Sequence, residues 1–439
     1  MSDPTNMSQQ DEKEIIGWLQ NKSIPIEHIE AGNGFADLQP LKTVLEGVKI
    51  VGLGETTHGT REIFQLKHRL LEFLAIEMGF TTFAIEAGYA SCQQINDYVL
   101  HGIGDRATVL TAQWYVVWDT EEMAAMIDWM RAYNQMVPES KKVQFCGTDI
   151  NYNEYGRKAV LEYLRKVDPE QLAITGSFFE ALAIEDNKWP GLIDEQAEKN
   201  IAELLPQLQD LIDYLISNKD NFVGHSTLAE FNQSLRYVHI MKQWMMTNSS
   251  FIRPESVTRS TARSVAMAEN LMYLVESAEP DAKFVMSAAN SHLSLDGGEP
   301  NLGASLREKY GQSYFVFGFE FNQGAFQTRL VLPDKRRGDL KEVTLPPSSP
   351  GTRAWYFAQI NKDVLILDLR MPVDNPVVEY WLNSPQTVYQ AGWAFNESLE
   401  YTVDVNMVKA YDGIIFIDIT TTSRPNPNAL KTVANRNGL

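Results

Sequence analysis

The sequence predicts an α/β fold, with a mainly parallel central sheet, flanking helices and a large helical insertion. The first observation is a strand-helix-strand pattern over residues 48–85, which favours two parallel strands joined by a right-handed crossover. The second is that short apolar segments with the length of buried strands recur later, as at residues 143–146 and 284–288. The third is an almost uninterrupted helical pattern between residues 155 and 278. A long helical segment therefore separates the strands of one sheet along the chain.

The first strand-helix-strand unit has clear boundaries. Residues 48–53 are largely apolar and end at Gly54, as expected of a buried strand. Thr60 is the predicted N-cap of the next helix, in which apolar residues recur at helical spacing until Gly79 ends it. Residues 82–85 then form a second buried strand.

Helices and strands continue to alternate after this unit. Helical patterns cover residues 92–100 and 107–115, and a longer helix over residues 121–135 is predicted to begin with a capping box of Asp119 and Glu122. The remaining predictions are strands at residues 143–146, 284–288, 314–319, 326–332, 364–369 and 413–418, and a helix at residues 303–310.

The chain is expected to divide into five parts. Residues 333–351 are charged and then rich in Pro and Ser, so they are predicted to be a loop or linker. The parts are an N-terminal lead-in (1–45), the first half of the α/β core with the candidate site (46–155), a helical lobe (156–280), the second half of the core (281–345) and a C-terminal α/β extension (346–439).

Composition restricts the class of protein. The 439 residues suffice for a large core, and a hydrophobic fraction of 44% is typical of a folded globular protein. The net charge of −19 argues against nucleic acid or an anionic membrane as a partner and leaves a small-molecule substrate as the expected partner. Cys92 and Cys146 are expected to be buried free thiols. With no signal-like start and no apolar run of ~20 residues, a cytoplasmic protein is expected.

Ionisable residues follow several of the predicted strands. Glu55 and His58 lie in the turn after the first strand, Glu86 lies just past the second, and Asp149 ends the third. His292 follows the strand at residues 284–288. Ligands of open α/β sheets bind beyond the carboxyl ends of the strands, so we expect these five side chains to meet on one edge of the sheet. This convergence is the main sign of an enzyme.

A histidine beside carboxylates is suited to general base catalysis near neutral pH, because the carboxylate fixes its tautomer and raises its basicity. The same residue types bind zinc or manganese, but their spacing matches no tight metal motif, so we predict neither metal nor cofactor. The chain lacks a Gly-x-Ser-x-Gly elbow and a P-loop, and Gly52-Leu53-Gly54 lacks the third glycine of a dinucleotide fingerprint. Water activated by a base is therefore the expected nucleophile of a hydrolysis.

Two further cations are candidates for the site. Lys67 lies on the helix after His58, where it either extends its stem past apolar neighbours or stabilises a developing oxyanion. Arg263 shares one face of a predicted helix with Asn270, and an inward position and a structural role are both open for that face.

Several stretches together resemble the erythromycin esterase family, over roughly residues 45–425. These stretches are Gly54-Glu55-Thr56-Thr57-His58-Gly59-Thr60, Phe83-Ala84-Ile85-Glu86, Trp129-Met130-Arg131-Ala132-Tyr133-Asn134, Arg263 with Met267-Ala268-Glu269-Asn270, Asn290-Ser291-His292, and Asp412-Gly413-Ile414-Ile415-Phe416-Ile417-Asp418 with Thr420 and Thr421.

The resemblance implies hydrolysis of a macrocyclic lactone by a water that a histidine activates without a metal; macrolide detoxification, a route to antibiotic resistance, is its best-known form. His58 would be the base, Glu55 and Glu86 would orient it or the water, and His292 would bind the carbonyl or shuttle a proton. The expected substrate-binding or oxyanion-binding residues are Lys67, Asn290, Arg263 and Asp149.

Two positions depart from the family pattern, which usually has arginine in place of Lys67 and histidine in place of Ala289. Lysine lacks the two-pronged donor of arginine, and alanine has no side-chain donor. The leading hypothesis is a hydrolase of an ester or lactone. The alternatives are a family member recruited to an elimination, cyclisation or acyl transfer in natural-product biosynthesis, and a binding protein with a decayed site.

Overall fold

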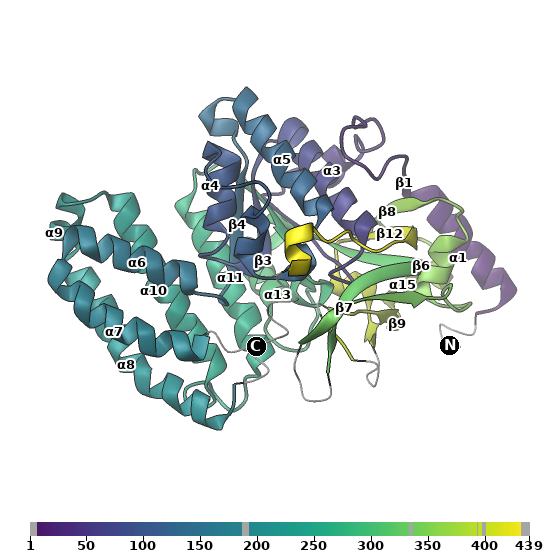
Figure 1. Ribbon diagram of the computed structural model, residues 1–439. Helices are drawn as coiled ribbons and strands as arrows, with labels where there is room; N and C mark the ends of the chain where they lie inside the picture. The colour runs from purple at the N-terminus through teal and green to yellow at the C-terminus, as the bar shows by residue number, and fades with distance from the viewer. Residues whose placement is uncertain (1–6, 187–192, 333–336, 393, 397–400, 432–439) are drawn as a thin grey trace.

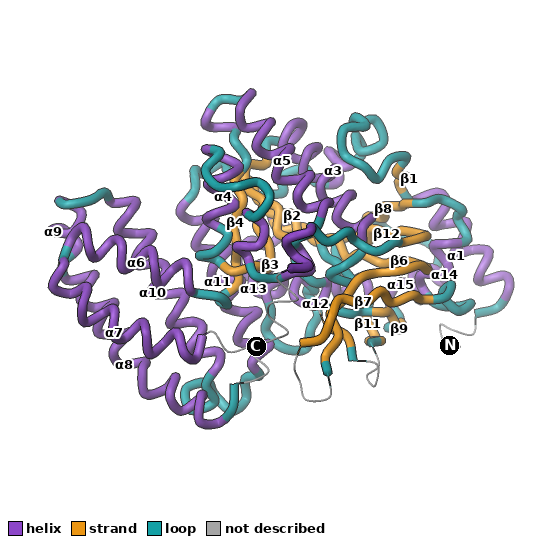
Figure 2. The backbone as a smooth tube through the Cα atoms, in the orientation of Figure 1, coloured by secondary structure: helices purple, strands orange, loops and turns teal. Residues whose placement is uncertain are grey.

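The computed structural model describes residues 7–186, 193–332, 337–392, 394–396 and 401–431. A mixed, mainly parallel sheet crosses the body of the molecule between layers of helices (Figures 1 and 2). Its strands lie in the order β1-β8-β12-β6-β2-β5-β3-β4, and β7 and β10 also pair with β6. The predicted fold class is thereby confirmed.

The parallel part of the sheet consists of β2 (Ile50–Leu53), β3 (Phe80–Gly88), β4 (Gln144–Asp149), β5 (Lys283–Ser287), β6 (Tyr314–Val331) and β12 (Gly413–Thr420). The predicted crossover between β2 and β3 is α3 (Arg61–Met78), which ends at Gly79 with φ 76°. The strand β5 lies between β2 and β3, so the long helical segment separates neighbouring strands.

The strands with antiparallel partners lie in the part of the sheet from β6 to β1, away from β4. They include β1 (Ile24–Ile26), β7 (Arg337–Leu345) and β8 (Val364–Asp368), while β10 (Ala394–Phe395) pairs parallel to β6. A separate two-stranded sheet joins β9 (Gln386–Tyr389) to β11 (Thr402–Val405). The predicted strands at residues 364–369 and 413–418 correspond to β8 and β12.

Successive side chains of a strand point to opposite faces of the sheet, so they belong to two different apolar cores. On one face, Val51 and Phe83 pack with α3, α4 (Gln93–His101) and α5 (Glu121–Met136). On the other, Ile50 and Met286 pack with elements from both halves of the chain. These elements include α1 (Gln9–Lys22), α11 (Arg259–Ser277), α13 (Leu302–Tyr310), α14 (Arg353–Ala358), α15 (Pro376–Asn383) and α16 (Met407–Ala410).

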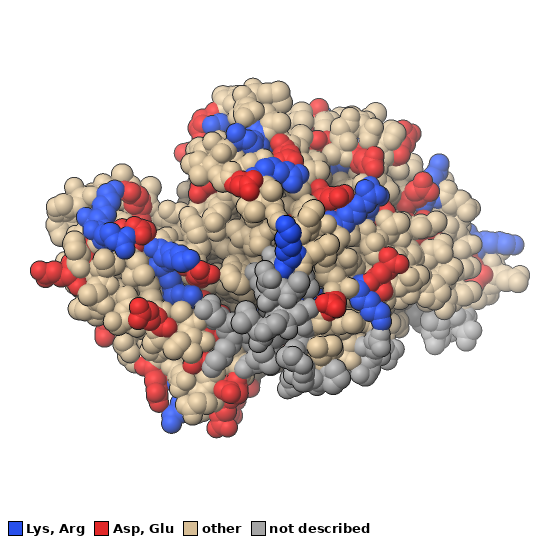
Figure 3. Space-filling view, in the orientation of Figure 1, with Lys and Arg blue, Asp and Glu red and all other residues tan. Residues whose placement is uncertain are grey.

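A helical lobe lies beside the β4 edge of the sheet (Figure 1). It comprises α6 (Glu154–Val167), α7 (Pro169–Asp186), α8 (Glu195–Ser217), α9 (Lys219–Gly224) and α10 (Leu228–Asn248). These helices share an apolar core, to which Ala90, Ile150 and Ala266 also contribute. On the face in Figure 3, charges of both signs are interspersed, and the surface is hollowed between the lobe and the body. No helix among the described residues is long and apolar enough to cross a membrane.

The structure corrects the prediction of a loop over residues 333–351 in one part, because β7 over residues 337–345 pairs antiparallel with β6. Residues 346–351 are a loop as predicted, and residues 333–336 lie outside the described residues. Its sequence, Arg-Gly-Asp-Leu-Lys-Glu-Val-Thr-Leu, carries charges that are tolerated on a strand whose second edge is open. The strands predicted at residues 314–319 and 326–332 are one strand, β6, which passes through Gly324 at φ 120°. A glycine inside a strand is therefore compatible here with continuous pairing.

Two local predictions around α5 are wrong. Residues 107–115 hold only the short 3₁₀ turn η1 (Val109–Gln113), with η2 (Val116–Trp118) next to it. The N-cap of α5 is Thr120, which accepts from the backbone N–H of Met123, whereas Asp119 accepts from Asn426 at 2.9 Å. The remaining short helices are α2 (Leu41–Val44), α12 (Asn290–Leu293), η3 (Glu139–Lys141) and η5 (Gly311–Ser313).

Candidate active site

The turn after β2 places Glu55 against His58. Both side chains are almost completely buried, and His58 Nδ1 lies 2.5 Å from Glu55 Oε1. The carboxylate accepts a hydrogen bond from Nδ1–H, so in the neutral imidazole the lone pair lies on Nε2. Among the described residues, Nε2 has no hydrogen-bond partner. His58 is therefore arranged as a base whose reactive nitrogen points away from its carboxylate.

Lys67 supplies the charge that balances Glu55. Its ammonium reaches across from α3, donates to Glu55 Oε2 and also donates to Ser287 Oγ at 2.9 Å. Burial raises the pKa of the Glu55 carboxyl, but Lys67 and His58 outweigh this effect and leave the pKa lowered. Burial likewise lowers the pKa of Lys67, and Glu55 opposes that shift. The geometry places Lys67 as a buried counter-ion of Glu55.

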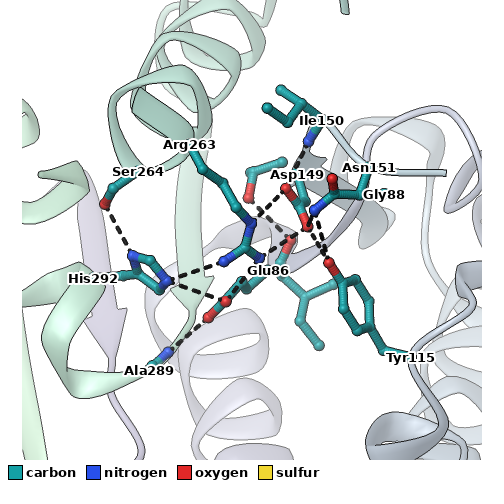
Figure 4. Close-up of polar contacts among 12 residues, drawn as sticks. Glu86, Gly88, Tyr115, Asp149, Ile150, Asn151, Arg263, Ser264, Ala289 and His292 are labelled. Atoms are coloured by element: carbon teal, nitrogen blue, oxygen red, sulfur yellow. Dashed lines mark hydrogen bonds and ion pairs between the residues drawn. The ribbon is translucent and has the colours of Figure 1, made fainter. Parts of the chain in front are cut away.

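Arg263 joins the carboxylates that end β3 and β4 (Figure 4). Its Nε and Nη2 donate to the two oxygens of Asp149, each at 2.9 Å, and Nη2 also lies 2.9 Å from Glu86 Oε1. The paired contact with Asp149 is a two-pronged charge-assisted interaction. The Arg263 side chain extends from α11, so this helix closes the ends of two neighbouring strands.

His292 lies on the other side of Glu86. Its Nε2 is 3.3 Å from Glu86 Oε1, and its Nδ1 is 3.0 Å from Ser264 Oγ. Ser264 Oγ also accepts from the backbone N–H of Leu302, and Arg263 Nη1 lies 3.3 Å from His292 Nε2. Both ring nitrogens of His292 are thereby oriented.

The charges around Glu86 favour its ionised form. Burial raises the pKa of the Glu86 carboxyl, but His292 and Arg263 outweigh burial and hold the pKa well below its usual range. Burial lowers the pKa of Arg263, and Asp149, Tyr115 and Glu86 reverse the direction and raise it well above its ordinary value. Glu86 and Arg263 are therefore ionised partners at neutral pH.

Two consecutive backbone N–H groups connect the two halves of the site. Ala289 N donates to Glu86 Oε2 at 3.0 Å, and Asn290 N donates to the Glu55 carbonyl at 2.9 Å. The structure therefore brings Glu55, His58, Glu86, Asp149 and His292 to the carboxyl ends of neighbouring strands. We refer to Glu55, His58 and Lys67 as the His58 cluster, and to Glu86, Asp149, Arg263 and His292 as the Arg263 cluster.

Asn290 holds the β5 turn against β6. Its Nδ2 donates to the Phe319 carbonyl at 2.8 Å, and its Oδ1 accepts from the Phe319 N–H at 3.1 Å. Because both ends of the amide bind one backbone unit, the geometry gives Asn290 a positioning role rather than direct contact with substrate. Asn270, on α11, donates to the Thr148 carbonyl beside Asp149.

The sequence analysis missed the aromatic side of the site. Tyr115 is buried, and its hydroxyl lies 2.5 Å from Asp149 Oδ2, to which Asn151 also donates at 3.0 Å. The Trp118 ring meets the His58 ring edge-on, with centroids 5.3 Å apart. A signal was present in the Trp-Tyr-Val-Val-Trp sequence at residues 114–118, which the prediction of a plain helix obscured.

A polar cavity of about 510 Å³ opens beside His292. Ser264, Ser291 and Gln390 line it together with the loop around Asp296. It leaves room for a water or a polar part of a substrate next to the imidazole. Within the described part of the chain, no three His, Cys, Asp or Glu side chains are grouped as they would be to hold a metal ion.

The fold and the site define an α/β protein with a histidine–carboxylate pair and a second histidine–arginine–carboxylate group at the ends of its parallel strands. Comparison with known proteins gives the family. The erythromycin esterase family model matches residues 76–420, and the chain belongs to that family.

Relatives and solved structures agree with this membership. The chain is 25% identical to the putative hydrolase YbfO of Bacillus subtilis, covering 94% of this chain and 92% of that protein. It is 26% identical to erythromycin esterase type II of Escherichia coli, in a match that covers 70% of this chain and 77% of that protein. A crystal structure of a Bacillus cereus protein matches with a TM-score of 0.80 and 26% identity, covering 94% and 99%. These matches support a hydrolase.

Proposed function

We propose that the protein hydrolyses an ester or lactone bond of a macrolide-like or related natural product, and that His58 activates the water. The observation that carries this proposal is the His58–Glu55 hydrogen bond, which leaves His58 Nε2 without a hydrogen-bond partner in the described part of the chain. When Nε2 takes a proton from water, the imidazolium forms beside an ionised carboxylate, which stabilises it. Family membership and the relatives named hydrolase and esterase support the reaction class.

The Arg263 cluster is suited to the electrophilic side of the reaction. Arg263 uses Nε and Nη2 on carboxylates, while its Nη1 lies 3.3 Å from His292 Nε2. The remaining N–H donors of Arg263 are proposed to stabilise the oxyanion that forms when water adds to the carbonyl, and His292 is proposed to bind the carbonyl or to shuttle a proton. Collapse of that intermediate breaks the acyl–oxygen bond, and the leaving alkoxide takes a proton, for which His58 and His292 are the candidates.

The two departures from the family pattern bear on the choice of substrate. The side chain that the family usually has at residue 289 is missing, although the Ala289 backbone still donates to Glu86. Lys67 contacts Glu55 through a single ammonium, where arginine would offer a planar fork. These changes favour, as the second candidate, acid–base chemistry without hydrolysis, such as an elimination, a cyclisation or an acyl transfer in natural-product biosynthesis.

Mass spectrometry of erythromycin, other macrolides and simple lactones incubated with the protein separates the two candidates. The proposal predicts a mass gain of one water on at least one compound with the wild type and no gain with His58→Ala. Lys42→Met, which alters an exposed ion pair, serves as the control variant and should behave like the wild type. A panel left unchanged by the wild type would contradict hydrolysis and favour the second candidate.

A further inference from the structure

Trp114 adopts a backbone conformation that a bulky residue rarely takes. Its φ is 71°, and the side chain of Gln113 enforces this turn from the preceding position. The Gln113 amide donates to the Tyr115 carbonyl at 2.7 Å and accepts from the Tyr115 N–H at 2.8 Å. A strained conformation persists only where neighbouring contacts impose it, and here a buried amide side chain does so.

Tyr152 is held in the same way on a different loop. Its φ is 64°, and it lies between two buried asparagines. Asn151 donates to Asp149 Oδ2 at 3.0 Å, and Asn153 donates to the Ile150 carbonyl at 2.9 Å. Only one other non-glycine residue of the described chain has a positive φ, and it is an asparagine, a residue type that tolerates this region.

The two strained residues meet. Their rings are stacked with centroids 5.3 Å apart and an interplanar angle of 11°, and both side chains are partly exposed. A continuous series of ring contacts leads from this pair to the base: Tyr152 to Tyr115 at 5.2 Å, Tyr115 to Trp118 at 5.1 Å and Trp118 to His58 at 5.3 Å. The stacked pair therefore adjoins the catalytic groups on their aromatic side.

We propose that Trp114 and Tyr152 form a substrate-binding platform that takes the apolar face of a ring in the substrate. Both rings are partly exposed, and a rigid flat aromatic surface is an efficient anchor for a ring of a ligand. Tyr115, whose ring contacts the Tyr152 ring, lies on the opposite side of Glu86 and Asp149 from His292 (Figure 4). The polar cavity opens beside His292. This inference rests on the proposed function, because it names the part of the substrate that the same site recognises.

Binding in the absence of turnover tests the platform. In a His58→Ala background, titration calorimetry with erythromycin, other macrolides and simple lactones measures Kd. Adding Trp114→Ala is expected to raise Kd about 10-fold or more for a ring-bearing compound. Trp129 and Tyr133 on α5 are a matched control, since they form another stacked pair with centroids 5.2 Å apart. Trp129→Ala should leave Kd unchanged, and equal effects of the two variants would overturn the proposal.

Thermal unfolding distinguishes a stored strain from an ordinary packing role. Trp114→Gly should melt higher than Trp114→Ala, because glycine adopts positive φ without strain. The order should reverse in the helix, with Trp129→Gly melting lower than Trp129→Ala. Equal melting temperatures of the two Trp114 variants would contradict a strain imposed on this residue.

The outcomes separate this inference from the proposed function. Tight binding that depends on Trp114, without hydrolysis by the His58-containing enzyme, supports the platform and contradicts the hydrolase. Hydrolysis with the same KM in the wild type and Trp114→Ala supports the hydrolase and overturns the platform. If no compound of the panel binds or reacts, both are overturned.

Discussion

Lys67 illustrates how a site residue is redefined by its contacts. The sequence left open whether its cation stabilises an oxyanion, and the structure directs the ammonium to Glu55 and Ser287. The side chain is 2% exposed, so removing it would leave the Glu55 carboxylate buried without its counter-ion. A substitution of Lys67 is therefore expected first to lower the free energy of unfolding.

We therefore predict that Lys67→Met lowers the free energy of unfolding by about 3–5 kcal/mol at pH 7. Lys42→Met, which breaks an ion pair of two partly exposed side chains, should change it by less than about 1 kcal/mol. Urea unfolding measures both changes. A Lys67→Met deficit as small as that of Lys42→Met would contradict a buried counter-ion.

The loss of unfolding free energy in Lys67→Met should also depend on pH. Because the folded-state pKa of Glu55 is lowered, pairing of its carboxylate adds stability above the ordinary pKa of 4.5, and this stability is lost as pH falls through the folded value. Removing Lys67 takes away the main opposing charge, so the variant should lose less stability than the wild type on acidification. In urea unfolding, the difference in the free energy of unfolding between the two proteins should shrink as the pH falls below about 4.5, and a constant difference would contradict a charge pair between Lys67 and Glu55.

Glu86 is predicted to affect activity more than Lys67 does. Its carboxylate contacts Arg263, His292 and the Ala289 N–H, all on the side of the proposed oxyanion. Glu86→Gln should lower kcat by about 100-fold on a compound that the wild type hydrolyses, because it disturbs the orientation of two catalytic groups. Lys67→Ala should lower kcat less, measured per folded enzyme. Comparable losses, or the opposite order, would show that the centre of the site is assigned incorrectly.

At the scale of elements, the turn after β2 depends on a close approach to β6. A Cβ added to Gly59 would lie 1.7 Å from the Gln327 carbonyl oxygen, so the backbone itself would have to move. Gly59→Ala is predicted to displace the turn that carries His58, lowering both kcat and the melting temperature. Gly17 of α1 is a suitable control, since nothing lies within 4 Å of its added Cβ.

The control has an expected direction of its own. Gly17→Ala adds a good helix former inside α1 and should raise stability by about 0.5–1 kcal/mol without changing kcat. Both variants can be compared by thermal unfolding and by one kinetic assay. A Gly59→Ala protein with wild-type kcat and melting temperature would contradict the close approach of the turn to β6.

The elements that could be predicted from sequence are those with a local signal. Apolar runs located β2, β5 and β12, and a glycine in the left-handed region located the end of α3. The strand β7 was missed because its pairing with β6 is a long-range contact that a charged sequence does not reveal. Thr120 and Asp119 are both good caps, and the contacts of the Asp119 carboxylate with Asn426 and Thr111 decide between them.

The candidate site likewise contains residues that the sequence locates and residues that only the tertiary structure locates. Glu55, His58, Glu86 and Asp149 were located from the rule that functional groups follow parallel strands, and the structure places them together. Tyr115 could not be placed in the same way, because it lies in an irregular segment whose position depends on tertiary packing. Ser264, which orients His292, has no signal beyond its position next to Arg263.

At the scale of the whole molecule, we propose that the helical lobe over residues 156–280 is a separate folding unit up to α11. The helices α6 to α10 share one core, while α11 also packs on the sheet and carries Arg263 into the site. The lobe should therefore be able to lose order locally while the sheet stays protected.

Leu208→Ala tests this division, since Leu208 is fully buried in the core of the lobe. The substitution should destabilise the lobe by about 2–5 kcal/mol. Hydrogen exchange measured by mass spectrometry should show faster exchange in α6–α10 and unchanged protection in β2 and β3. Uniformly faster exchange would contradict an independent lobe.

The proposed nucleophile is a water that His58 activates. A single-turnover reaction in ¹⁸O-labelled water tests it, using any lactone or ester that the protein hydrolyses. The account predicts one ¹⁸O atom in the product carboxylate in the first turnover and no reaction with His58→Ala. A product carboxylate without ¹⁸O in that turnover would contradict the attack of water on the carbonyl, and conversion by His58→Ala at the wild-type rate would exclude His58 as the base.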